Sequence, residues 1–162
     1  MHTILESAHA WFFDSLMHSL NGTLVVRLVE GIKGKERQFV GVGETKLGPY
    51  FPVQVEAESQ CVQVTFTNAL AFFIYNESYD TTDTDLKKDA GRFLFKATSS
   101  SFRTFAESRT TVGQVHPEPY SEYLLCCEDR VFSVLAAEEP TVSLLQESPN
   151  LSIERTNTWS AS

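Results

Sequence analysis

The chain has 162 residues, of which 42% are hydrophobic and 21% charged, and its formal net charge at pH 7 is −8. This balance is typical of a globular domain and argues against wholesale disorder. The negative charge also argues against a nucleic-acid-binding surface, because such surfaces are basic. Residues 1–148 are therefore predicted to form a single domain, and residues 149–162, which hold few apolar side chains, a loosely ordered tail.

Residues 4–20 are predicted to form a helix. Apolar side chains recur there at steps of three and four residues, Trp11 and Leu16 among them, and this spacing gives one broad apolar face. Asn21-Gly22 then supplies residues that tolerate a left-handed helix end. We expect the helix to cover a sheet, and docking to a partner is the alternative.

From residue 23 the apolar pattern changes to a period of two, which is typical of strands. Four glycines and a basic stretch within residues 31–43 predict a turn and an irregular sheet edge. A short helix is predicted after Ser100 or Ser101, either of which would serve as its cap. The fold class that follows is α+β, with a mainly antiparallel sheet of roughly seven or eight strands and both helices packed on it.

A cytoplasmic location is expected. Residues 1–20 lack the basic start and the uniform apolar run of a secretory signal. The longest uninterrupted apolar run, residues 69–75, is too short to span a bilayer. The three cysteines suggest no disulfide framework. We therefore expect no association with a membrane.

Familiar catalytic and metal-binding spacings are absent from the sequence. Cys126 and Cys127 lie within an apolar predicted strand, which is typical of inert core thiols, although pairing of one of them with His116 stays open. The aspartates of residues 80–89 fail the calcium-loop pattern, because the required glycine and the final glutamate are missing. We therefore expect no cofactor and no metal, and we favour a non-enzymatic protein over an enzyme.

The clearest electrostatic feature is residues 117–147, which hold seven acidic residues and one arginine. Carboxylates around aromatic anchors suit the capture of a basic protein surface, and a solvated sheet face is the alternative. The leading hypothesis is a non-enzymatic protein-binding module, an acidic inhibitor or immunity-type protein for a basic partner. The residues predicted to bind that partner are Glu118, Tyr120, Glu122, Tyr123, Glu128 and Asp129.

The second hypothesis is a β-rich domain that binds a small ligand. Asn76, Glu77 and Tyr79 follow a very apolar predicted strand and begin a long acidic loop. Polar groups at the mouth of a buried strand are frequent in binding sites, whereas a hydrogen-bonded turn would explain the same residues. Under either hypothesis, exposed strand edges would also allow a homodimer.

Overall fold

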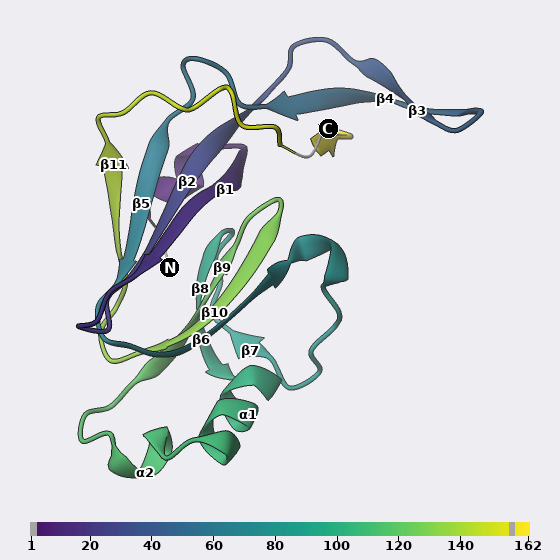
Figure 1. Ribbon diagram of the computed structural model, residues 1–162. Helices are drawn as coiled ribbons and strands as arrows, with labels where there is room; N and C mark the ends of the chain where they lie inside the picture. The colour runs from purple at the N-terminus through teal and green to yellow at the C-terminus, as the bar shows by residue number, and fades with distance from the viewer. Residues whose placement is uncertain (1–2, 156–157) are drawn as a thin grey trace.

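Two antiparallel β-sheets make up most of the molecule (Figure 1). The computed structural model describes residues 3–155 and 158–162. Its helical segments are the 3-10 turns η1 (Ile4–Ser7) and η2 (Glu77–Tyr79) and the helices α1 (Ser101–Arg109) and α2 (Val112–Val115). Its strands are β1 (Ala10–His18), β2 (Leu24–Lys33), β3 (Gln38–Val42), β4 (Thr45–Gln54), β5 (Cys61–Phe66), β6 (Ala69–Asn76), β7 (Lys87–Lys88), β8 (Leu94–Ser99), β9 (Ser121–Cys126), β10 (Arg130–Ala136), β11 (Thr141–Leu145) and β12 (Thr158–Ser160).

The first sheet contains one group of four paired strands, β1, β2, β5 and β11, and a hairpin of β3 and β4 that projects beyond them. In this group β2 pairs with β1 on one side and with β5 on the other, and β11 pairs with the outer edge of β5. β4 pairs with the end of β2 at Ile32 and Lys33, and farther along it pairs with β12 and then with β3. The strand order of the second sheet is β6-β10-β9-β8-β7.

The two sheets pack face to face and enclose one hydrophobic core, so the architecture is a β-sandwich. Trp11 of β1, Phe66 of β5 and Phe132 of β10 are fully buried in this core. The Trp11 indole N–H donates to the carbonyl oxygen of Leu5 at 2.8 Å, which satisfies its one polar atom away from water. The helices α1 and α2 lie on the far side of the second sheet (Figure 1).

The prediction of a helix over residues 4–20 is wrong, because most of this segment is strand β1. Trp11 and Phe13 pack into the core, whereas Phe12 joins a separate apolar cluster on the outer face of the sheet. A register shift between Phe13 and Ser15 then displaces the alternation by one residue, so that Leu16 again packs against the core. This bulge produces the three-residue apolar step that resembles a helical period.

The predicted α+β class is also wrong, because the chain is mostly β and folds into two sheets instead of one sheet covered by helices. The short helix after Ser100 is present as α1, and the Ser100 hydroxyl accepts a hydrogen bond from the Arg103 N–H at 2.9 Å. This bond satisfies one of the free amides of the first helical turn. The helix packs outside the sandwich, where its Phe102 ring stacks on Phe73 of β6.

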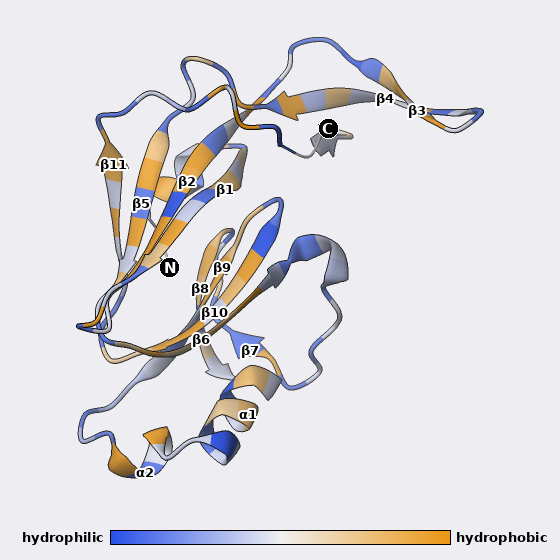
Figure 2. Ribbon diagram, in the orientation of Figure 1, coloured by the Kyte–Doolittle hydropathy of each residue, from blue (hydrophilic) through white to orange (hydrophobic). Residues whose placement is uncertain are grey.

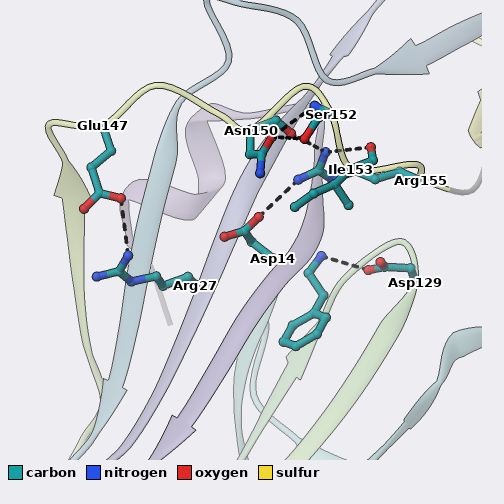
Figure 3. A network of polar contacts seen from close by, with 9 residues as sticks. Asp14, Arg27, Asp129, Glu147, Asn150, Ser152, Ile153 and Arg155 are labelled. Carbon is teal, nitrogen blue, oxygen red and sulfur yellow. Dashed lines mark hydrogen bonds and ion pairs between the residues drawn. The ribbon is translucent and has the colours of Figure 1, made fainter.

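The segment 146–155, which we call the strap, crosses the outer face of the first sheet before β12 (Figure 3). Arg155 donates to Asp14 of β1 at 3.1 Å and to the carbonyl oxygen of Asn150 at 3.1 Å. A second ion pair joins Glu147 to Arg27 of β2 at 3.3 Å. β12 pairs with β4. The prediction that residues 149–162 are loosely ordered concerns mobility and stays a prediction.

We expect Asp14→Asn to loosen the strap without unfolding the sandwich. The Arg155 side chain is only 11% exposed, so loss of its carboxylate partner leaves a poorly solvated cation. Hydrogen exchange of the strap amides should accelerate roughly fivefold, which corresponds to about 1 kcal/mol of local opening free energy. Arg27→Gln is the matched control, because both partners of its ion pair are exposed and such pairs contribute little. Equal exchange in the two variants would contradict this account of the strap.

Candidate functional site

Glu118 and Tyr120, the first two residues predicted to bind a partner, lie between α2 and β9. Glu118 is exposed, and Tyr120 is half-buried. The Tyr120 hydroxyl donates to Glu107 of α1 at 2.8 Å, and this bond together with the nearby Arg103 guanidinium lowers the pKa of the Glu107 carboxyl. The Tyr120 hydroxyl is thus engaged within the chain, while its ring remains partly accessible.

Glu122 and Tyr123 lie inside β9 and are buried. Glu122 is fully buried, and its Oε2 accepts a hydrogen bond from the Ser100 hydroxyl at 2.6 Å. Its Oε1 has no hydrogen-bond partner among the described residues. Burial is the main cause of the raised pKa of this carboxyl, since the charged form loses its hydration. In this structure neither side chain contributes to an exposed face.

Glu128 and Asp129 form the turn between β9 and β10, roughly 20 Å along the sheet from Tyr120 at about 3.3 Å per residue. Glu128 is exposed, and Asp129 accepts a hydrogen bond from the Phe13 N–H at 2.9 Å. Partial desolvation raises the pKa of both carboxyls, and the negative charge of Glu77 raises that of Glu128 further. The six predicted residues therefore do not form a single surface.

The structure places Glu77 next to Asp129, although more than 50 residues separate them. The Glu77 N–H donates to the carbonyl oxygen of Asp129 at 3.3 Å, because β6 and β10 pair and both end here. The Asn76 side chain caps η2 by accepting a hydrogen bond from the Ser78 N–H at 2.9 Å. This is the hydrogen-bonded turn that the sequence analysis gave as the alternative to a ligand-binding role. Tyr79 is 79% exposed.

Residues from both hypotheses, Glu128 from the first and Glu77 and Tyr79 from the second, lie at one end of the second sheet. We call this surface the acidic end and define it by Glu77, Tyr79, Asp80 and Glu128. Asp80 is exposed, and its carboxylate accepts a hydrogen bond from the Tyr75 hydroxyl at 2.6 Å. The acidic end thus holds three carboxylates and one exposed aromatic ring, and the nearby Arg92 guanidinium lowers the pKa of Glu128 in part. Carboxylates beside an aromatic ring suit a cationic or amphipathic protein segment.

A second surface lies on the hairpin of β3 and β4, residues 38–50, which we call the arm. It projects beyond the sandwich (Figure 1), and hydrophobic stretches occur within it (Figure 2). Val40 pairs with Leu47, and Val42 follows two residues later, so these three side chains share one face. Val42 is 57% exposed and Leu47 44%. A methyl group added at Gly41 would meet no atom within 4 Å.

Another apolar patch lies on the outer side of the second sheet. Phe73 of β6 and Phe105 of α1 are exposed, and Phe102 lies with them. The rings of Phe73 and Phe102 stack with centroids 6.1 Å apart, so this patch already buries part of its surface within the chain. The arm's apolar face has no such covering layer among the described residues.

A hollow of about 240 Å³ lies beneath the strap, and Phe12, Val53, Ile153 and Arg155 are among its lining residues. Asn76, Glu77 and Tyr79 do not line this hollow or a second one beside β11. Their predicted role at the mouth of a ligand cavity therefore gains no support from these hollows and stays a prediction.

Cys126 is half-buried and Cys127 is buried. Burial raises the pKa of the Cys126 and Cys127 thiols, which makes the reactive thiolate scarce at neutral pH. Within residues 3–155 and 158–162, no group of three or more His, Cys, Asp or Glu side chains could hold a metal ion. In the same part of the chain no helix is long and apolar enough to cross a membrane.

Comparison with known proteins gives no match: no family model, no curated protein and no solved structure matches the chain. The fold and the two surfaces therefore have to be interpreted from their own geometry.

Proposed function

We propose that the chain is a protein-binding module and that the arm is its principal contact element. The observation that carries this proposal is the apolar face of Val40, Val42 and Leu47 on a two-stranded projection. Such a hairpin is only marginally stable in water by itself, because it has one exposed layer and no core. An apolar projection of this kind is typically buried by a partner.

The acidic end is the second element of the proposal. Glu77 and Glu128 repel each other, and this repulsion contributes to the raised pKa of Glu128. A basic partner surface would relieve that repulsion and would also accelerate association at low salt. The proposal thus retains an inhibitor or immunity-type protein for a basic partner, with Glu128 as a contact residue and Glu122 and Tyr123 as structural residues.

We expect the double variant Val42→Ser/Leu47→Ser to lose the partner while keeping the fold. Both side chains are largely exposed, so their replacement should change the free energy of unfolding by less than about 0.5 kcal/mol each. Wild type and variant would be immobilised as baits in lysate of the source organism. The proposal predicts that a protein retained by the wild type is reduced at least about tenfold on the variant, as expected when apolar anchors are removed.

Phe105→Ser is the matched control, because it removes an exposed apolar side chain of the other patch on α1. The control should retain the partner as the wild type does. Loss of the partner with Phe105→Ser, together with retention by the arm variant, would move the contact to the helix side of the second sheet. That result would contradict the proposed role of the arm.

A further inference from the structure

The chain itself carries a surface that complements its arm. Resting on the proposed function of the arm, we infer that the arm's partner is a second copy of this chain, whose acidic end receives it. The complement is both electrostatic and apolar, and each copy contributes one arm and one acidic end. Two copies related by a two-fold axis would therefore form the same contact twice and close a dimer.

The base of the arm is basic within an acidic chain, while the arm itself, residues 38–50, holds one lysine and one glutamate. Residues 33–50 contain four basic and two acidic side chains, whereas the whole chain has a net charge of −8. Lys35, Arg37 and Lys46 are exposed. Arg37 also lies over the Phe51 ring at 5.0 Å, which holds this cation near the base of the arm. Opposite net charges on two surfaces of one protein favour contact between its copies.

The acidic end matches the arm in its apolar content as well. Tyr79 is 79% exposed, and in the sequence it lies between the exposed residues Glu77 and Asp80. In the dimer, the Tyr79 ring would supply a large contact area for the aliphatic face of Val42 and Leu47, while the carboxylates of the acidic end would face the cations at the base of the arm. Figure 1 shows that the arm extends away from the second sheet, whose end carries η2.

Variants with reversed charges distinguish the proposed contact from nonspecific association. The variant Lys35→Glu/Arg37→Glu makes the base of the arm acidic, and Glu77→Lys/Glu128→Lys makes the acidic end basic. All four side chains are exposed, so both variants should fold. In sedimentation velocity at low salt the wild type should dimerise as its concentration rises. Its dissociation constant should increase on the order of tenfold at high salt.

Each reversed variant alone should remain monomeric, because like charges then meet at both contacts. Their equimolar mixture should dimerise, because both contacts are again between opposite charges. A mixture that stays monomeric, or dimerisation that Val42→Ser/Leu47→Ser leaves intact, would overturn the inference. A wild type that is monomeric at every concentration would overturn it too. If the arm variant still lost its lysate partner in that case, the proposed function would stand with another protein as partner.

Discussion

Replacing Trp11 by alanine is expected to lower the free energy of unfolding by about 3–5 kcal/mol, the range for a fully buried aromatic side chain. The residue is 0% exposed and packs between the two sheets. Its loss removes apolar burial from the centre of the core and also leaves the Leu5 carbonyl oxygen without the indole donor. Urea denaturation monitored by circular dichroism measures the change.

Two further variants complete this test. Phe39→Ala removes an aromatic side chain that is 63% exposed on the arm and should change stability by less than about 0.5 kcal/mol. Trp11→Phe keeps most of the ring but loses the hydrogen bond to Leu5, so it should fold and lose about 1–2 kcal/mol. Equal losses for Trp11→Ala and Phe39→Ala would contradict the assignment of β1 to the sandwich core.

Glu122→Gln is expected to make the protein more stable than the wild type at pH 8, by about 1–3 kcal/mol, the usual cost of a buried polar group without a full set of partners. Burial raises the folded-state pKa of Glu122 above its unfolded value. The stability contributed by the protonated form is therefore fully present below the unfolded pKa, near 4.5. It is lost as the pH rises through the folded pKa.

The pH dependence gives the sharper measurement for Glu122. Between pH 4.5 and pH 8 the free energy of unfolding of the wild type should fall relative to that of Glu122→Gln, and near pH 4 the two curves should converge. Glu118→Gln is the control, because this glutamate is exposed and its replacement should leave the pH profile unchanged. A difference between wild type and Glu122→Gln that does not vary with pH would contradict the burial of a titrating carboxyl.

The period of two that the sequence predicts is present in β5, which buries every second side chain. β10, in contrast, buries six consecutive residues, so a period of two does not mark this strand. The helix predicted at residues 4–20 is wrong because the bulge after Phe13 in β1 shifts the apolar side chains by one residue. A single sequence cannot distinguish that shift from a helical period, since both yield apolar residues three apart.

For the acidic residues 117–147, the local sequence pattern does not show which side chains are buried or which residues lie next to one another in space. Glu122 lies between Ser121 and Tyr123, and this local pattern does not indicate that its carboxyl is buried. The Ser100 hydroxyl, at the start of α1, reaches that carboxyl only in the folded chain. The proximity of Glu77 to Glu128 depends on the pairing of β6 with β10, which the sequence does not reveal. Long-range strand pairing, rather than any motif, assembles the acidic end.

The glycines of residues 31–43 predict a turn and an irregular sheet edge, and one of them, Gly43, also indicates the tight turn of the arm. Gly43 adopts φ +60° in the two-residue connection between Val42 and Thr45. Glycine at the first position of such a connection, with apolar residues on either side, is typical of a tight hairpin. What the sequence could not show is that the sandwich leaves this hairpin uncovered, because that depends on where the remaining strands end.

Hydrogen exchange of the arm, measured with and without the partner that the wild type retains, tests the central claim most directly. In the free protein the outer edge of β3 pairs with no described strand, so its amides should exchange fast. We predict that binding slows exchange across residues 38–50 more than elsewhere in the first sheet. Unchanged exchange in the arm, with new protection confined to other strands, would contradict the account.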